Sequence, residues 1–299
     1  MDLTKYSFLD VTVVDRNMLF FIAVEDEYVE ENPDHSVILQ LHQGNWKKLD
    51  VSEKLVSCTL STYPTRQMVC VAENGMSASL GGGKLTLECI ALGADSPSSN
   101  GPLVEVRSVC RGKAWAVGTS RQAYRKEDIG NWLRMDQTSK SSDPQERANS
   151  CFHSIDGFSE SEIYCVGWEG EIWRFDGMSW SQCLSPTNLT LYKVRCCSDG
   201  YVYACGQLGT IIRGRGDSWG IIQQEETEEH LRSLAFFKGK LYLVSSNLAY
   251  ELSGKKFVQL RDDFTATTCG ELDANEDVLI SVGLKDIMLF DGQNWQKLT

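Results

Sequence analysis

The sequence predicts an all-β protein, a seven-bladed β-propeller with four antiparallel strands in each blade. Three observations predict this fold. The aromatic residues Trp219, Phe257 and Trp295 recur every 38 residues near the ends of similar units. Within the units, short apolar or alternating runs are separated by Asp-Gly and Lys-Gly turns, which are typical of β-hairpins. No segment shows a sustained helical period, and four short strands in roughly 40 residues describe one propeller blade.

The units can be followed along the whole chain. Their fourth strands are expected to carry Trp46, Leu87, Trp132, Trp180, Trp219, Phe257 and Trp295 in turn. The expected blades cover residues 6–50, 51–93, 103–137, 150–185, 190–224, 230–261 and 265–299. A blade cannot cover both faces of its sheet alone, so we expect a single domain over residues 1–299. Since each unit runs from first to fourth strand, blades 1 and 7 are expected to pack face to face without exchanging a strand.

The fourth unit carries the most regular pattern of the chain. Residues 164–180 read Tyr-x-Val-Gly-x-x-Gly-x-Ile-x-Arg-Phe-Asp-Gly-x-x-Trp. This pattern resembles the bacterial propeller repeats of the YVTN and BNR (Asp-box) types, and more broadly WD-repeat-like propellers. The resemblance is specific in the last three to four units, and it implies a fold rather than an activity.

Composition limits the class of protein. The chain has 299 residues, of which 42% are hydrophobic, and no run approaches the roughly 18 apolar residues of a membrane helix. Residues 1–5 show neither a basic start nor an apolar signal core, so we expect a cytoplasmic protein without a membrane partner. The eleven cysteines are odd in number and are expected to be reduced thiols in apolar strands. They include Cys58, Cys70, Cys110, Cys165, Cys196, Cys205 and Cys269.

No pattern of reactive side chains indicates catalysis, a metal or a cofactor. The four histidines, His35, His42, His153 and His230, lie far apart in sequence and are expected to pack in the core. The run from Gly81 to Lys84 lacks the Ser or Thr that a phosphate loop needs. Asp-box turns also occur in sialidases, but a glycosidase needs acids and an arginine cluster that the sequence does not identify. We therefore expect no enzyme and no cofactor, with a lectin or glycosidase as a remaining alternative.

The charge is concentrated in three segments. The net charge of -12 argues against nucleic acid, which is bound by neutralising phosphates, and favours a basic protein partner. Loops after second and fourth strands emerge on one face of a propeller, and the acidic segments map to that face in blades 6, 7 and 1. They contain no Lys or Arg, and their twelve acids equal the net charge: Glu25, Asp26, Glu27, Glu30, Glu31, Asp34, Glu225, Glu226, Glu228, Glu229, Asp262 and Asp263.

The opposite face is expected to carry turn bases, namely Arg16, Arg66, Arg111, Lys113, Lys238, Lys240, Lys255 and Lys256. Trp168, followed by Glu169, falls in the loop after the second strand of blade 4. It is expected to be an interface anchor, a sugar platform or a packed core residue. The acidic loops are either solvated segments that aid solubility or a docking surface that steers a cationic protein.

A small propeller with a one-sided acidic face resembles the stand-alone immunity proteins of polymorphic toxin systems, including contact-dependent growth inhibition. The resemblance implies a non-catalytic protein that neutralises a basic, nuclease-type toxin domain through this face. The partner-binding residues would be the twelve acids together with Trp168 and Glu169. A general protein-interaction scaffold is the alternative.

Overall fold

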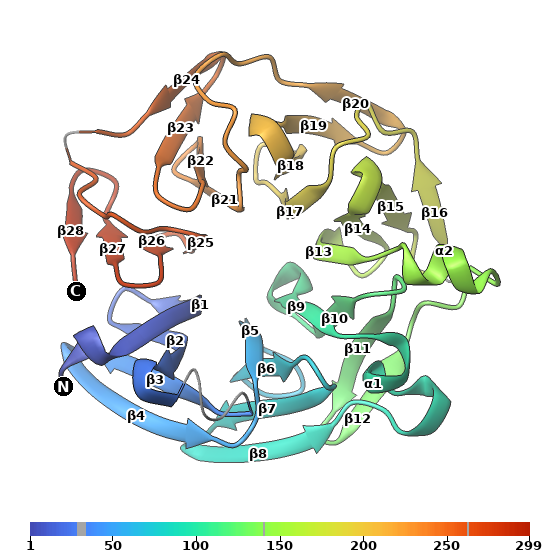
Figure 1. Ribbon diagram of the computed structural model, residues 1–299, viewed down its shortest axis with the longest axis horizontal. Coiled ribbons are helices and arrows are strands. Elements are labelled where there is room, and N and C mark those ends of the chain that lie inside the picture. Colours follow the sequence, from blue (N-terminus) through green and yellow to red (C-terminus); the bar gives the residue numbers. More distant parts are fainter. Residues whose placement is uncertain (29–33, 140, 262) are drawn as a thin grey trace. The chain divides into compact units, whose positions relative to one another are not determined.

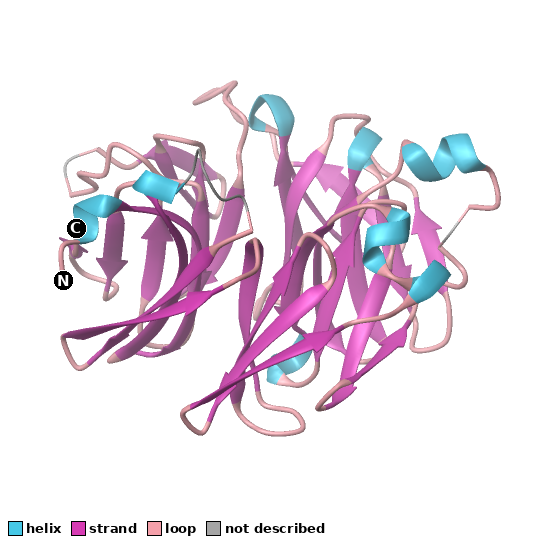
Figure 2. Ribbon diagram, turned by 60° about the horizontal axis from the view of Figure 1, so that its bottom comes forward, coloured by secondary structure: helices cyan, strands magenta, loops and turns pink. Residues whose placement is uncertain are grey.

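A computed structural model describes residues 1–28, 34–139, 141–261 and 263–299. In these residues the chain forms four-stranded antiparallel sheets, seven in all, and each sheet contains four strands that are consecutive in the sequence (Figure 1). The predicted seven-bladed β-propeller is therefore confirmed. Strands dominate and the helices are short, the longer of them being α1 (Pro97–Asn100) and α2 (Pro144–Ala148) (Figure 2).

The chain divides into two compact units. The first comprises residues 1–54, 207–210 and 223–299, and the second comprises residues 55–206 and 211–222. The strands of blades 1, 6 and 7 belong to the first unit, and those of blades 2 to 5 belong to the second. The acidic segments predicted from the sequence all lie in the first unit, whereas Trp168 and Glu169 lie in the second.

The first unit contains blades 1, 6 and 7. Blade 1 consists of β1 (Tyr6–Asp15), β2 (Met18–Glu25), β3 (Ser36–His42) and β4 (Asn45–Val51), with short helices η1 (Leu3–Lys5) and η2 (Asp26–Tyr28). Blade 6 consists of β21 (Ser233–Phe237), β22 (Lys240–Val244), β23 (Ala249–Ser253) and β24 (Lys256–Gln259). Blade 7 consists of β25 (Glu271–Ala274), β26 (Leu279–Val282), β27 (Ile287–Phe290) and β28 (Trp295–Lys297).

The second unit contains the strands of blades 2 to 5. Blade 2 has β5 (Leu55–Ser61), β6 (Gln67–Ala72), β7 (Met76–Gly81) and β8 (Lys84–Cys89), followed by η3 (Gly93–Asp95). Blade 3 has β9 (Leu103–Ser108), η4 (Val109–Arg111), β10 (Ala114–Gly118), β11 (Ala123–Asp128) and β12 (Asn131–Arg134). Blade 4 has β13 (Phe152–Ser159), β14 (Glu162–Gly167), η5 (Trp168–Gly170), β15 (Ile172–Phe175) and β16 (Trp180–Cys183). Blade 5 has β17 (Leu191–Cys196), β18 (Val202–Gly206), β19 (Ile211–Arg215) and β20 (Ser218–Ile221); η6 (Gln207–Gly209) follows β18 and belongs to the first unit.

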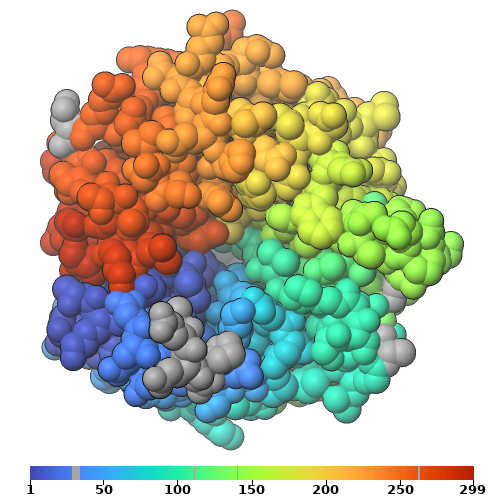
Figure 3. Space-filling model, viewed as in Figure 1, coloured from blue at the N-terminus to red at the C-terminus, as the bar shows by residue number. Residues whose placement is uncertain are grey.

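Blades 1 and 7 pack face to face in the first unit. Phe8 and Phe21 of blade 1 share one apolar cluster with Val278, Ile280 and other residues of blade 7. The backbone N–H of Phe8 donates to the carbonyl of Leu284 at 3.0 Å. The two ends of the chain lie side by side (Figure 3), and neither blade borrows a strand from the other. Apolar packing and backbone contacts therefore join the first blade to the last.

The Asp-Gly turns form the hairpins that the sequence predicts. Asp176 Oδ1 accepts hydrogen bonds from the N–H groups of Met178 and Ser179, both at 2.8 Å. Gly177 in the same turn has φ of +98°, which glycine adopts without steric strain. The turn leads into Trp180, which is buried between blades 3 and 4. Among the other expected anchors, Trp132 is buried, whereas Trp46, Trp219 and Trp295 are half-buried at the edges of their clusters.

Glycines end the second strands of several blades because another backbone passes against them. A Cβ atom on Gly118, Gly167 or Gly206 would lie between 1.8 and 2.3 Å from the carbonyl oxygen of the segment entering the same blade. A Cβ on Gly283 would lie 2.1 Å from the carbonyl carbon of Thr268. The glycines at the ends of these strands therefore allow a close approach between the second strand and the blade's entry segment.

We expect Gly206→Ala to destabilise the protein by more than about 2 kcal/mol, because the new methyl group would meet the Thr190 carbonyl, which is backbone and cannot rotate away. The matched control is Gly220→Ala, whose Cβ would have no atom of another described residue within 4 Å apart from its chain neighbours. Urea denaturation followed by circular dichroism measures both variants. Equal midpoints for the two variants would contradict this account of Gly206.

All eleven cysteines are free thiols. Most are buried, but the expectation that Cys110 lies in an apolar strand is wrong. It is exposed within η4, where the turn requires φ of +52° and ends the strand before this residue. Cys269 is buried but precedes β25 rather than lying in it.

Candidate functional site

The acidic segment at residues 223–230 has a well-defined conformation that neutral side chains hold in place. Gln224 accepts hydrogen bonds from the N–H groups of Glu226 and Thr227 through Oε1, at 2.8 and 3.1 Å. Its Nε2 donates to the carbonyls of Gly209 and Thr227. Tyr250 donates its hydroxyl to Thr227 Oγ1 at 3.0 Å. The loop is thus tied to blade 6 and to the turn after β18.

The carboxylates of this loop take no part in holding it. Glu225, Glu226 and Glu228 are exposed and Glu229 is half-buried. Within the residues that the structure describes, none of the four carboxylates forms an ion pair. The loop therefore presents four negative charges on a backbone that its neutral residues fix.

The acids of blade 1 differ from this pattern because lysines from other elements reach two of them. Glu25 at the end of β2 pairs with Lys48 of β4 at 2.7 Å, and these contacts raise the pKa of Lys48. Asp26 pairs with Lys285 of blade 7, and the hydrogen bond from Lys285 is the main cause of its lowered pKa. Glu27 and Asp34 are exposed, and Glu30 and Glu31 lie outside the described residues. The segment itself contains no Lys or Arg, but lysines from other elements pair with two of its acids. Its free negative charge is therefore smaller than its composition suggests.

The acidic segments of the first unit share one end of its blades. Asp26 binds Lys285 in the turn between β26 and β27. Asp286 in the same turn accepts from Thr268, and the N–H of Cys269 donates to the carbonyl of Ser246 in blade 6. Asp263, in the connection from blade 6 to blade 7, is exposed; Asp262 lies outside the described residues. The turns after the second strands of blades 1, 6 and 7 therefore contact one another or the segment that enters blade 7.

Several of the predicted turn bases are already engaged. Lys113 pairs with Glu127, Lys240 pairs with Glu251 at 2.9 Å, and Lys238 donates to the carbonyl of Asp291 at 2.5 Å. The Arg111 side chain lies outside the described part of the structure. These lysines hold neighbouring strands and turns together.

In the second unit, Trp168 lies where the sequence places it, in the turn after the second strand of blade 4. It is half-buried and Glu169 is exposed. The Trp168 ring lies edge-on to His153 of β13, with centroids 6.0 Å apart. Burial lowers the pKa of His153 to about 4, so this imidazole is neutral near pH 7.

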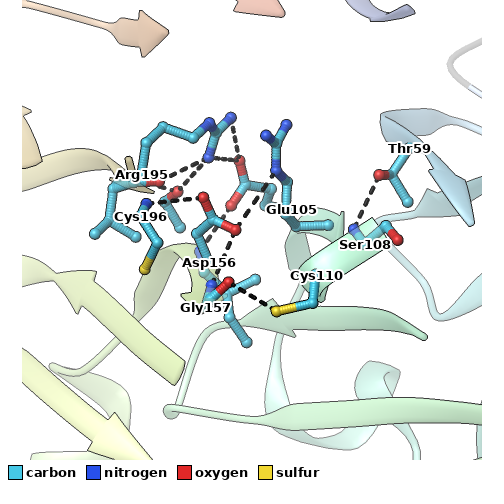
Figure 4. Close-up of polar contacts among 12 residues, drawn as sticks. Thr59, Glu105, Ser108, Cys110, Asp156, Gly157, Arg195 and Cys196 are labelled. Atoms are coloured by element: carbon cyan, nitrogen blue, oxygen red, sulfur yellow. Dashed lines mark hydrogen bonds and ion pairs between the residues drawn. The ribbon is translucent and has the colours of Figure 1, made fainter. Parts of the chain in front are cut away.

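Sequence reasoning missed a set of polar contacts between first strands, which connect each blade to the next within a unit (Figure 4). A first strand is an edge strand, so its outward N–H groups lack a partner in its own sheet. Here a side-chain oxygen of one blade accepts from the N–H of the following blade. We call these contacts inter-blade staples: Thr59 to Ser108, Glu105 to Ile155, Ser154 to Val194, Asp156 to Cys196, Ser233 to Leu272, and Asp273 to Val13.

Glu105 joins three blades. Its Oε2 accepts from the N–H of Ile155 in blade 4 at 2.8 Å. Its Oε1 lies 3.0 Å from Lys193 Nζ and 3.4 Å from Arg195 Nη2 in blade 5. Burial opposes ionisation of Glu105, but these two cations and the Ile155 N–H outweigh it and hold its pKa at about 2. In Figure 4 Glu105, Asp156 and Arg195 come together from the first strands of blades 3, 4 and 5.

No group of three or more His, Cys, Asp and Glu side chains is placed to hold a metal ion in the described part of the chain. Cys151 and His153, which share a strand region, have no third ligand there. The same residues include no helix that is long and apolar enough to cross a membrane.

The solved structures that resemble this chain are propellers of different kinds. Virginiamycin B lyase from Staphylococcus aureus matches with a TM-score of 0.74 and 10% identity, covering 96% of this chain and 94% of its own. YCF48 from Cyanidioschyzon merolae matches with a TM-score of 0.70 and 13% identity, covering 97% of both chains. The WD40 β-propeller domain of Doa1 has a TM-score of 0.67 and 10% identity over 98% of this chain and 92% of its own. These likenesses show the fold alone.

The sequence comparison is more specific. No family model matches the chain, so the YVTN or BNR type of its repeats stays a resemblance. A curated relative, the immune protein Tsi7 of Pseudomonas aeruginosa, is 36% identical over 299 residues, covering 97% of this chain and 97% of the relative. Because the identity extends over the whole propeller, the chain belongs to the family of the immune protein Tsi7.

Proposed function

We propose that this protein is a cytoplasmic, non-catalytic immunity protein that neutralises a basic, nuclease-type toxin domain by binding it through the acidic loops of blades 1, 6 and 7. The partner-binding residues are the acids of these loops, together with Trp168 and Glu169 of blade 4. The family relationship supports the immune role. The single observation that carries the proposed binding mode is the loop at residues 223–230.

A solvated acidic segment needs no internal order, whereas this loop is fixed by Gln224 and Thr227. Three of its four glutamates are exposed, and none forms an ion pair with another described residue. Fixed charges attract an oppositely charged partner without an entropic cost of ordering them on binding. They also steer the diffusional encounter, which raises the association rate at low salt. The acidic loop is therefore suited to fast capture of a cationic domain.

We expect the partner to be a basic toxin domain encoded by a neighbouring gene, and the experiment uses this domain as a catalytically dead variant. We expect Glu226→Gln/Glu228→Gln to lower its association rate constant about 10-fold at low ionic strength and to flatten the salt dependence. Stopped-flow fluorescence at several salt concentrations measures both quantities. The loop should keep its shape because the hydrogen bonds that fix it do not involve these carboxylates.

The matched control is Asp217→Asn/Asp277→Asn, which removes the same two negative charges from exposed turns elsewhere in the blades. If the control slows association as much as the loop variant does, net charge alone governs the encounter. The acidic loops then have no specific role, and the proposed binding mode fails.

A further inference from the structure

The turn after β14 in blade 4 has a backbone that the fold fixes on both sides. A Cβ on Gly167 would lie 1.8 Å from the carbonyl oxygen of Cys151, and one on Gly170 would lie 2.2 Å from that of Thr187. The N–H of Glu171 closes the turn onto the carbonyl of Trp168 at 3.1 Å. Trp168 and Glu169 are therefore held between the entry segments of blades 4 and 5.

Glu169 occupies a left-handed conformation with φ of +54°, a region that favours glycine over residues with a Cβ atom. The corresponding turns use it too, with Ser120 at +61° in blade 3 and Leu208 at +50° after β18. The fold thus demands this conformation but not a particular side chain. Glu169 is exposed and forms no hydrogen bond or ion pair among the described residues. The fold accounts for the backbone strain but makes no use of the exposed carboxylate, which is therefore available to a partner.

The side chain before Glu169 offers an aromatic surface. Trp168 is half-buried and its ring contacts His153, which in turn lies 5.7 Å from the ring of Tyr192 on β17. His153 Nε2 is buried and has no hydrogen-bond partner among the described residues. Because His153 is neutral near pH 7, it adds no positive charge that would repel a cation at Trp168. The edge-on contact with His153 therefore helps to hold the indole in place.

We propose that Trp168 and Glu169 form a receptor for one lysine or arginine side chain of the protein partner. The indole face attracts the cation through its quadrupole, and the adjacent carboxylate pairs with the charge. This inference rests on the proposed function in that it takes the partner to be the basic domain. Besides the acidic loops, it assigns a further contact with the partner. This contact lies in the second unit and holds one side chain of the partner.

The first experiment needs no toxin. Acetyl-arginine amide is titrated into the ¹⁵N-labelled protein, and the indole signal of Trp168 is followed by NMR after assignment with Trp168→Phe. We expect a saturable shift with acetyl-arginine amide, and little shift with its neutral isostere, acetyl-citrulline amide. Glu169→Gln should weaken the interaction about 5-fold. Absence of a shift, or equal shifts with the neutral isostere, overturns the inference.

A sugar platform makes the opposite prediction, since sugars stack on tryptophan without needing a cation. A methyl glycoside series is titrated under the same conditions. A saturable Trp168 shift with a glycoside, unchanged in Glu169→Gln, would replace the cation receptor by a lectin site.

The second experiment uses the basic partner domain. We expect Trp168→Ala to raise the dissociation constant about 30-fold, mainly through faster dissociation. Glu169→Gly should weaken binding about 5-fold while leaving the melting temperature unchanged or higher, because glycine relieves the left-handed strain. Leu208→Gly, which relieves the same strain after β18, is the control and should bind normally. Wild-type binding by Glu169→Gly overturns the inference. If the partner does not bind wild-type protein at all, the proposed function fails, and the arginine titration still decides the receptor.

Discussion

Replacing Glu105 by alanine is expected to lower the free energy of unfolding by about 3 to 5 kcal/mol. The variant leaves Lys193 and Arg195 buried without their shared carboxylate and leaves the Ile155 N–H without an acceptor. Removing one member of a buried ionic contact costs this much because an uncompensated charge stays in a medium of low polarity. Urea denaturation at pH 7, followed by circular dichroism, gives the value.

Two further measurements separate charge from hydrogen bonding at this site. Ser233→Ala removes a neutral inter-blade staple in the first unit, and we expect it to cost only about 1 kcal/mol. Since the pKa of Glu105 is lowered to about 2 in the folded protein, its ionic contribution is present above the ordinary glutamate pKa and lost as the pH falls towards 2. The stability gap between wild type and Glu105→Gln should shrink over that range. A gap independent of pH would show that the negative charge of Glu105 does not contribute to stability.

The second large effect is expected at the buried pair formed by Glu88 of β8 and Lys126 of β11. Lys126 is fully buried, donates to Glu88 Oε2, and its Nζ lies 5.2 Å from the ring centroid of Trp132. Glu88→Leu should cost about 3 to 5 kcal/mol, because the ammonium cannot reach water from this position between blades 2 and 3. The same denaturation measurement applies.

The double variant Glu88→Leu/Lys126→Met tests the cause. Two apolar residues of similar size need no desolvation of charge, so we expect the double variant to be within about 1 kcal/mol of wild type or more stable. Lys126→Met would then restore the stability that Glu88→Leu removes. If the two losses simply add, the sites act independently and the pair does not explain the effect of Glu88→Leu.

The sequence predicts the blades well because each blade is encoded locally. The Asp-Gly turns at Asp176 and Asp291, and the aromatic residue that follows each of them, depend on interactions within a few residues. The staples between blades that follow each other along the chain join residues 39 to 50 positions apart, and the staple from Asp273 to Val13 joins residues 260 positions apart. The register of such contacts cannot be read from one sequence. The staple from Glu105 to Ile155 is such a case, and a glutamate in an apolar strand gives no signal of its partner.

The candidate site shows the same contrast between features that are encoded locally and features that depend on distant contacts. The acidic segments could be located from composition, because charge is a property of the residues themselves. Their free charge could not, since Lys48 and Lys285 reach Glu25 and Asp26 from a different strand and a different blade. The order in residues 223–230 was equally hidden, because it depends on Gln224, which no charge pattern singles out. The sequence predicts the position of the Trp168 turn, but the contact of Trp168 with His153 depends on how the turn packs against the first strand of blade 4.

The glycines that flank the turn at Glu169 have a consequence for how such a protein can diverge. Gly167 and Gly170 fix the backbone, while the residue between Trp168 and Gly170 points away from the fold. Its chemical character can therefore change in a single substitution without any repacking inside the blade. Corresponding turns already carry Ser120 and Leu208 in the same conformation. An inhibitor built this way can follow a changing target one side chain at a time, while the scaffold that carries those side chains stays the same.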